Sequence, residues 1–152
     1  MQFSGCNHLY VDPVDSENKE EYLEAVWMIE ETGESPVKIS TISQKLKIAP
    51  PSAVQMLKKL EKEGYLKYKT REGVILTRKG NRIGRRMVRN GMLIESLMVE
   101  SLGIEIDPKV ACGIEHHMTD EFTNAICSLM RHPIKCPHGN LIPKGTCCNR
   151  KK

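Results

Sequence analysis

The sequence lacks any run of eighteen apolar residues, about the minimum for a helix that crosses a bilayer. Its first twenty positions hold polar residues such as Asn7, His8 and Asp12, where a secretory signal needs an apolar stretch. No internal repeat, low-complexity tract or HExxH metalloprotease motif occurs. These absences predict a cytoplasmic protein with no membrane segment, and they argue against a zinc hydrolase.

Charge is distributed unevenly along the 152 residues, although the net charge is only +4. The net charge is −8 over residues 1–37, +12 over 38–90, −6 over 91–130 and +6 over 131–152. Such alternation predicts a basic surface for an anionic polymer and an acidic region suited to cations. A solvated basic face without function is the alternative that composition alone leaves open.

Residues 16–76 follow a pattern typical of a winged helix-turn-helix. Ser16 can cap a first helix that ends at Thr32-Gly33, and a short second helix precedes Pro50-Pro51. A third helix begins at Pro51 and ends at Gly64, and a hairpin is predicted around Arg71-Glu72-Gly73. The expected buried positions of the second and third helices are Ile39, Ile42, Leu46, Leu57 and Leu60.

The second half of the chain predicts a bundle of helices. A long helix begins at Thr77 or Arg78 and runs to about Leu102, where Gly103 stops it. Asp107-Pro108 starts another helix, and Thr119 caps the last one. The predicted fold class is therefore mainly α, with a winged helix-turn-helix DNA-binding domain followed by an all-helical metal-binding and dimerisation domain. The expected domains are residues 1–77, 78–143 and a Cys/Lys-rich tail, 144–152.

Cys112, Glu115 and His116 have the spacing i, i+3, i+4, which places a thiol, a carboxylate and an imidazole on one face of a helix. This mixture of sulfur, nitrogen and oxygen favours a divalent first-row metal over Mg²⁺ or Ca²⁺, whose ligands are all oxygen. On an isolated helix, a buried thiol beside a surface ion pair is the commoner arrangement.

The segments EEYLEAVWMIEE, KISTISQKLKIAPPSAVQMLKKLEKEGYLKYKTREGVILTRKGNRIG, GIEHHMTDE and CPHGNLIP occur in this order. In order and spacing they resemble the diphtheria-toxin-repressor family of iron- and manganese-dependent regulators, over roughly residues 16–143. The resemblance implies an N-terminal winged helix and a helical dimerisation domain, in the two-domain form without the SH3-like domain that some members add. It also implies operator DNA and a second copy of the chain as partners, with no membrane and no small-molecule substrate.

The resemblance implies one metal site formed by Glu21, Cys112, Glu115 and His116. The iron-responsive branch has methionine where this chain has Glu21, so the ligand set is a hybrid of the iron and manganese branches. The cysteine favours Fe²⁺, since Mn²⁺ prefers oxygen-rich surroundings, while the acids keep Mn²⁺ as the alternative. Co²⁺, Ni²⁺ or Zn²⁺ is expected to substitute in vitro.

Further candidate ligands are Glu24, Glu95, Asp107 and His117. Glu21 and Glu24 are also compatible with ordinary exposed acids of a helix, and of the two Glu21 is the favoured ligand. His117 is expected to lie on the surface or to support a ligand rather than bind the metal. The ancillary site of the iron branch aligns with Gly91 and a shortened region near Asp107, which leaves Glu95 alone and argues against a conventional second site.

An additional zinc or iron site is a weaker hypothesis for the C-terminal region. Its candidate ligands are Cys136, His138, Cys147 and Cys148, with His132 nearby and Cys6 and His8 at the other end of the chain. In a reducing compartment the six cysteines are expected to be free thiols or metal ligands. Their spacings fit no standard zinc finger, and CPHG alone is compatible with a simple turn.

The third helix is the predicted DNA-reading element. Ser52, Gln55 and Lys59 are expected to face bases or phosphates, while Arg71 on the wing and Lys58 contact phosphates. Ala49, Pro51 and Gln55 align with base-reading positions of the family, although Ala49 lacks the serine hydroxyl found there. The full set of predicted DNA-binding residues is Lys38, Ala49, Pro51, Ser52, Gln55, Lys58, Lys59 and Arg71.

The sequence thus predicts a metal-dependent repressor that dimerises, binds operator DNA when loaded with metal and controls metal homeostasis genes. Two alternatives of other classes remain at this stage. One is a constitutive winged-helix DNA-binding protein with structural metal, and the other is a zinc hydrolase that uses Glu115 as its base.

Overall fold

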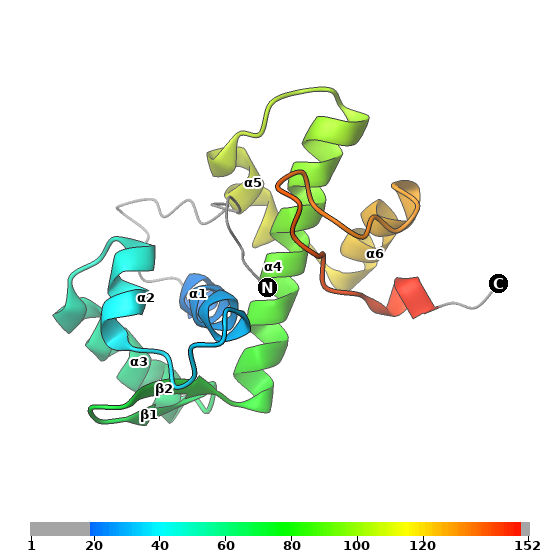
Figure 1. The fold of residues 1–152 in the computed structure, drawn as a ribbon. Coiled ribbons are helices and arrows are strands. Elements are labelled where there is room, and N and C mark those ends of the chain that lie inside the picture. The colour runs from blue at the N-terminus through cyan, green and yellow to red at the C-terminus, as the bar shows by residue number, and fades with distance from the viewer. Residues whose placement is uncertain (1–18, 150–152) are drawn as a thin grey trace. The chain divides into compact units, whose positions relative to one another are not determined.

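The computed structural model describes residues 19–149 (Figure 1). These residues form six α-helices, two β-strands, one short π-helix and one short 3₁₀-helix. The order is α1 (Lys19–Glu31), α2 (Ile39–Leu46), α3 (Pro50–Lys62), β1 (Leu66–Lys69), β2 (Gly73–Leu76), α4 (Arg78–Ser96), the π-helix η1 (Leu97–Ser101), α5 (Pro108–Glu115), α6 (Asp120–Leu129) and the 3₁₀-helix η2 (Thr146–Asn149). The predicted mainly α fold class is confirmed. Ser16, Cys6 and His8, which the sequence singled out, lie outside the described residues.

Two compact units divide the described chain between Arg85 and Arg86, within α4. The first carries α1–α3 and the hairpin, and the second carries the rest of α4 with α5 and α6. Among residues 19–149, no helix is both long and apolar enough to cross a membrane.

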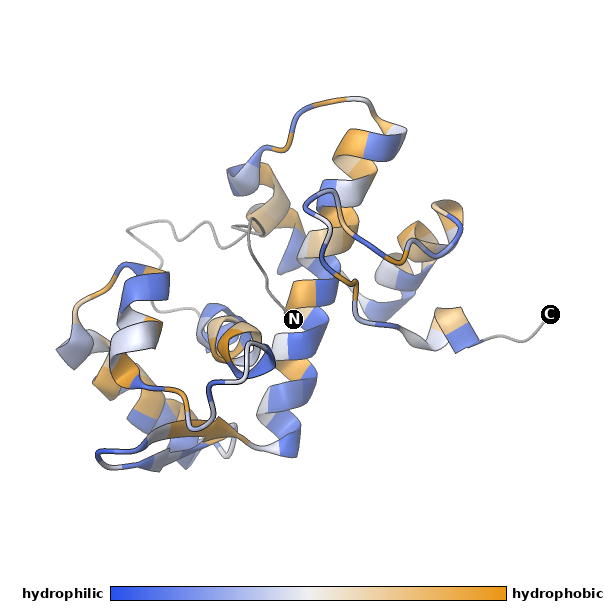
Figure 2. Ribbon diagram, viewed as in Figure 1, coloured by the Kyte–Doolittle hydropathy of each residue, from blue (hydrophilic) through white to orange (hydrophobic). Residues whose placement is uncertain are grey.

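The first unit has the winged helix-turn-helix arrangement that the sequence predicts. Helix α1 packs against α2, α3 and β2, and its apolar side chains form one core with those of its neighbours. Figure 2 shows apolar segments, in orange, on each of these elements. The fully buried members of this core include Leu23, Val26, Ile42, Leu46, Leu57, Leu60, Leu66 and Val74. Ile39, expected in the buried stripe, is only half-buried, because it is the first residue of α2.

The turn between α2 and α3 is built from local backbone preferences. Lys47 ends α2 in the left-handed conformation, with φ 54°, and its N–H donates to the carbonyl oxygens of Ser43 and Gln44. Pro50 and Pro51 then occupy the first positions of α3, where the missing N–H costs no helical hydrogen bond. Helix α3 therefore begins one residue earlier than Pro51, the predicted start.

The predicted hairpin is confirmed as an antiparallel pair with Leu66 opposite Leu76 and Lys69 opposite Gly73. Gly73 has φ 125°, and a side chain there would collide with the backbone of Val37. That close approach allows Val37 and Val74 to exchange two backbone hydrogen bonds of 2.8 and 2.9 Å. The wing is thus fixed to the segment that leads into α2.

The long helix that begins at Arg78 in the first unit and ends in the second does not continue as an α-helix to Leu102. From Leu97 to Ser101 it is a π-helix, and the Leu102 N–H donates to the carbonyl oxygen of Leu97 five residues earlier. Gly103, with φ 64°, ends the helix as predicted. The sequence carries no signal that separates this last turn from the preceding α-helix.

Side-chain caps place α5 and α6 where the sequence expects them. The Asp107 carboxylate accepts hydrogen bonds from the backbone N–H groups of Lys109 and Val110, and Pro108 opens α5. The Thr119 hydroxyl accepts from the N–H of Phe122 at the start of α6. Both helix starts confirm the sequence prediction.

Candidate DNA interface and metal-binding groups

Helix α3 presents a polar face to solvent and buries the opposite face. Ser52, Gln55 and Lys59 are exposed at spacing i, i+3, i+7, so they share one side of the helix. The buried side consists of Ala53, Met56, Leu57 and Leu60. The side that the sequence assigns to DNA is therefore the accessible one.

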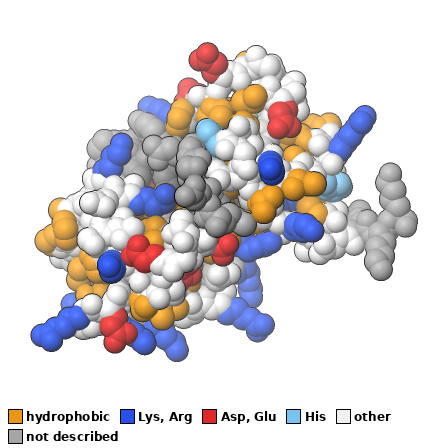
Figure 3. Space-filling view, viewed as in Figure 1, with side chains coloured by type: hydrophobic (Ala, Val, Ile, Leu, Met, Phe, Trp, Pro, Cys, Tyr) orange, Lys and Arg blue, Asp and Glu red, His pale blue; other side chains and the backbone are white. Residues whose placement is uncertain are grey.

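All eight predicted DNA-binding residues are exposed and lie in the first unit. They are Lys38, Ala49, Pro51, Ser52, Gln55, Lys58, Lys59 and Arg71. Arg71 stands at the tip of the wing with φ 71°, and Lys and Arg side chains project from the surface around the hairpin (Figure 3). A positive wing beside an accessible helix has the composition that phosphate contact and groove reading require.

Helix α5 holds Cys112, Glu115 and His116 within one turn. Cys112 is buried and the Glu115 side chain is fully buried, whereas the His116 ring is 12% exposed. The His116 Nε2 atom lies 3.7 Å from a Glu115 carboxylate oxygen. A carboxylate is rarely buried unless a positive or hydrogen-bonding group compensates its charge, and the His116 ring is one such neighbour.

A hydrogen-bond chain holds α5 against its neighbours in the second unit. The Asn90 side-chain amide, fully buried on α4, donates to the carbonyl oxygen of Glu115 over 3.1 Å. The Thr123 hydroxyl of α6 donates to the Asn90 side-chain oxygen over 2.8 Å. Sequence reasoning missed Asn90 and Thr123, because nothing in the sequence shows that these two polar side chains of different helices are buried together.

Glu21 and Glu24 lie one turn apart on α1 in the first unit, and both are buried. The alternative that they are exposed helix acids is therefore wrong. Two buried carboxylates on one helix have a high desolvation cost, which a bound cation or hydrogen bonds must offset.

The remaining candidate ligands have separate surroundings. The Asp107 carboxylate caps α5, His117 is exposed, and buried Glu95 has a carboxylate oxygen 3.4 Å from Nδ1 of His138. Within residues 19–149, Glu95 and Asp107 belong to no group of three or more metal-ligating side chains.

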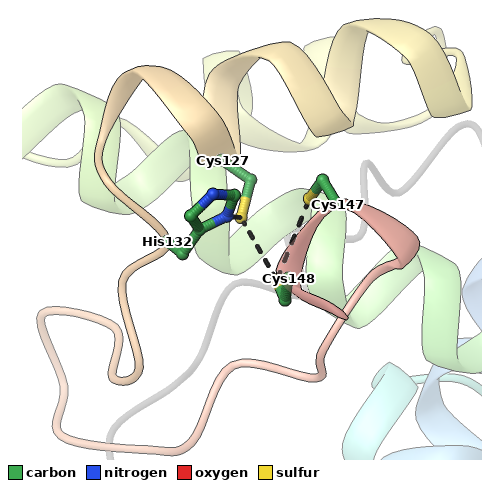
Figure 4. A group of neighbouring side chains, drawn as sticks. All are labelled: Cys127, His132, Cys147 and Cys148. Carbon is green, nitrogen blue, oxygen red and sulfur yellow. Dashed lines mark hydrogen bonds between the residues drawn. The ribbon is translucent and has the colours of Figure 1, made fainter. Parts of the chain in front are cut away.

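Four sulfur and nitrogen donors of the second unit converge between α6 and η2 (Figure 4). Cys127 Sγ lies 3.7 Å from Cys148 Sγ and 3.5 Å from His132 Nδ1, and the sulfurs of Cys147 and Cys148 are 3.8 Å apart. Cys136, which the sequence analysis grouped with Cys147 and Cys148, is buried in a separate turn closed by hydrogen bonds with Asn140 and Gly139. The group of Cys127, His132, Cys147 and Cys148, called the sulfur group below, thus differs from the predicted set.

The two facing thiols of the sulfur group differ in acidity. Burial, together with hydrogen bonds to Cys147 and Cys148, raises the pKa of the Cys127 thiol to about 12. Burial also acts to raise the pKa of Cys148. Hydrogen bonds from the Gly145 backbone, from Cys127 and Cys147 and from His132 outweigh that effect and lower the pKa to about 7. The group therefore stabilises a thiolate at Cys148.

A winged helix-turn-helix with an exposed reading helix, together with a helical unit that holds buried transition-metal donors, defines a metal-dependent transcription regulator. Residues 16–74 match the model of the iron dependent repressor N-terminal DNA binding domain, and residues 77–144 match the iron dependent repressor metal binding and dimerisation domain. The chain belongs to this iron-dependent repressor family, as the resemblance to the diphtheria-toxin-repressor family predicts.

Curated relatives include the HTH-type transcriptional regulator MntR of Shouchella clausii, 37% identical over 116 residues, which are 74% of this chain and 79% of that protein. MntR of Listeria welshimeri is 34% identical over 122 residues, covering 75% and 83% of the two chains. Both relatives are regulators, so the prediction that the chain is not an enzyme is confirmed and the zinc-hydrolase alternative is dropped.

Solved structures show the same fold. The manganese regulator SloR superimposes with a TM-score of 0.72 at 29% identity, and the match covers 84% of this chain. A hypothetical protein from Sulfolobus solfataricus, SSo2273, has a TM-score of 0.58 at 30% identity over 83% of this chain and 97% of its own. The chain spans 60% of the SloR structure, less than two thirds of its length.

Proposed function

We propose that this chain is a transcriptional repressor that binds operator DNA as a homodimer when loaded with a divalent metal. The observation that carries the proposal is the buried donor set of α5, in a chain whose other unit is an accessible winged helix. A protein that reads operator DNA works in the cytoplasm, which is the compartment the sequence predicts.

The regulatory metal is proposed to be held by Cys112, Glu115 and His116 of α5 with Glu21 of α1, and Glu24 is a further candidate. These residues fit a first-row divalent cation because they offer a thiol, an imidazole and two buried carboxylates. When bound, the metal supplies a link between the DNA-binding unit and the helical unit, and so favours one placement of the reading helices.

Asn90 and Thr123 have the positioning role in this proposal. Their hydrogen bonds fix the carbonyl group of Glu115, and with it the last turn of α5. Groups that hold the backbone of a metal ligand in place limit the entropy lost on binding and sharpen the choice of metal.

Two metals have specific support. Mn²⁺ is supported by the acids Glu21 and Glu24 and by similarity to the manganese regulator SloR, and we place it first. Fe²⁺ is supported by the thiol of Cys112, because Mn²⁺ prefers oxygen ligands and has the lower affinity for nitrogen and sulfur. The sequence alone favoured Fe²⁺.

The dimer is proposed to use an apolar face of the second unit. Ile114 of α5 and Phe122 of α6 are 37% and 50% exposed although both are large and apolar. They line an open hollow together with Gly113, His117, Met118 and Thr119. Sedimentation at micromolar concentration should show a dimer, and a strict monomer with and without metal would contradict the proposal.

The function is tested by anaerobic DNA binding to the promoter region of the protein's own gene, with Mn²⁺, Fe²⁺, Zn²⁺ or chelator added in turn. Operator affinity should rise with Mn²⁺ or Fe²⁺ and fall again with chelator. Unchanged affinity in chelator would instead support a constitutive winged-helix protein with structural metal.

A further inference from the structure

We propose that Cys127, His132, Cys147 and Cys148 form a zinc site with four protein ligands, separate from the donors of α5. The site joins the end of α6 to the 3₁₀-helix η2 near the C-terminal end of the described chain (Figure 4). It is a structural site, since four protein ligands leave no open position on a tetrahedral metal.

The spacing of the donor atoms fits tetrahedral zinc. With Zn–S of about 2.3 Å and Zn–N of about 2.05 Å, neighbouring sulfurs lie about 3.8 Å apart and sulfur lies about 3.6 Å from nitrogen. The two sulfur–sulfur distances in the group are 3.7 and 3.8 Å, and Cys127 Sγ lies 3.5 Å from His132 Nδ1. All four donor atoms lie within 4.8 Å of one another, so one ion can touch them all.

A disulfide does not account for this arrangement. Bonded sulfurs are about 2.05 Å apart, far less than either sulfur–sulfur distance in the group. Cys127, Cys147 and Cys148 are all free thiols. Pairing any two of them would also leave the third thiol and the imidazole without a common role.

The surroundings of the group suit a negatively charged complex. Three thiolates and one Zn²⁺ carry a net charge of −1, and the Arg89 guanidinium of α4 donates to Cys147 Sγ over 3.2 Å. Arg89 is itself buried, and Gly145 leaves room for it, because a side chain at that position would collide with the guanidinium. A cation that donates to a ligand sulfur is a typical outer-shell partner of a thiolate metal site.

The backbone after α6 directs His132 toward the sulfurs. Arg131 and His132 have φ of 59° and 57°, a left-handed conformation that residues other than glycine adopt at a cost. The His132 N–H donates to the carbonyl oxygen of Cys127 over 2.8 Å, which closes the chain back on the end of α6. This tight turn brings Nδ1 of His132 beside Cys127.

The donor set selects zinc over the proposed regulatory metals. Three sulfurs and one imidazole, with no carboxylate, match the Cys₃His composition of structural zinc sites. Mn²⁺ and Mg²⁺ prefer oxygen ligands. The second unit therefore holds two donor groups of different metal preference.

The test is the zinc content of the full-length protein, purified anaerobically with reductant and dialysed against EDTA. About one zinc per chain should remain in the wild type and in Cys112→Ser, which alters only the α5 donors. Cys127→Ser and Cys148→Ser should lose that zinc, whereas Cys136→Ser, a matched change of a buried cysteine outside the group, should keep it. Co²⁺ added to metal-free wild type should give the visible bands of a tetrahedral thiolate complex.

His132→Ala keeps the proposal testable if the cysteine variants fail to fold, because the His132 side chain is exposed. It should weaken zinc binding more than about tenfold, and His132→Cys should restore it. Absence of zinc and of tetrahedral Co²⁺ bands in the wild type would overturn the proposal. So would full retention of zinc in Cys127→Ser and Cys148→Ser, or zinc affinity in His132→Ala within twofold of the wild type.

Discussion

The donors of α5 and the sulfur group belong to the same helical unit, yet they differ in composition and in completeness. Helix α5 offers one sulfur, one nitrogen and one carboxylate, while the sulfur group offers three sulfurs and one nitrogen. Three donors leave a tetrahedral or larger coordination shell open, whereas four can close it. An open donor set can accept a further ligand, such as the proposed Glu21, whereas a closed one can only hold its own segment together. This difference is the basis for proposing a regulatory metal at α5 and a structural metal at the sulfur group.

The largest expected effect comes from removing the α5 donors, which tests whether they bind the regulatory metal. The double variant Cys112→Ala, His116→Ala should lower metal-stimulated operator affinity by about 100-fold, the upper range of a coupling between two sites. Weak non-specific DNA binding, the fold and the zinc of the sulfur group should remain. Fluorescence anisotropy with operator and random DNA measures the first two effects. Full metal-dependent operator binding by this variant would exclude α5 as the regulatory site.

Replacement of Glu21 tests the proposed regulatory site from the first unit, because it changes one ligand and leaves all donors of the second unit intact. Glu21→Met replaces a hard oxygen by a soft sulfur, so activation by Mn²⁺ should fall about tenfold relative to activation by Fe²⁺, Co²⁺ or Ni²⁺. The metal concentration for half-maximal operator binding measures the shift. Glu24→Met makes the same change at the further candidate ligand, also buried on α1, and shows which of the two acids sets the metal preference. An equal shift in both variants would assign no special role to Glu21.

Asn90→Ala tests whether the α5 donors depend on their hydrogen-bond support. The change leaves the Glu115 carbonyl and the Thr123 hydroxyl without their buried partner, so unfolding free energy should fall by about 1–3 kcal/mol. Metal activation should weaken several-fold, while zinc in the sulfur group stays unchanged. Urea denaturation and metal titration of the same sample give both values. A stability loss with unaltered metal affinity would limit Asn90 to a structural role.

The smallest expected effects concern DNA reading, where no metal donor is altered. Arg71→Ala should weaken operator and random DNA alike and reduce the salt dependence of log affinity by about one unit, because one phosphate contact is lost. Gln55→Ala should instead reduce the preference for operator over random DNA. Affinities measured over a range of salt concentrations separate the two variants. Equal losses from both on both DNAs would contradict the assignment of base and phosphate contacts.

The winged helix could be predicted from sequence because its boundaries are set locally. Gly33, the Pro50-Pro51 pair, Gly64 and Gly73 each act through their own backbone preferences, and the structure departs from the expected helix start by one residue. The grouping of the α5 donors could also be predicted from sequence, since their spacing follows from helical periodicity.

Only part of the sulfur group could be predicted from sequence. Cys147 and Cys148 drew attention as neighbours, but Cys127 lies on α6 and joins them only through the packing of that helix against η2. His132 reaches the group because Arg131 and His132 adopt the left-handed backbone conformation, which no sequence pattern predicts. His138, which is nearer than His132 to Cys147 and Cys148 in the sequence, lies beside Glu95 instead. Spacing predicts donors on one helix well and donors from several segments poorly.

Within the first unit, the first half of α4 approaches its neighbours through bare backbone at two points one turn apart. A side chain at Gly80 would collide with the carbonyl group of Tyr65, and one at Gly84 with the carbonyl group of Leu23 on α1. Flexible side chains between helices can absorb small displacements by changing rotamer, but backbone against backbone cannot. Leu23 lies between Glu21 and Glu24, so the carboxylate-bearing stretch of α1 and the first half of α4 must move as one rigid piece. Displacement of either acid is then inseparable from displacement of that first half of α4.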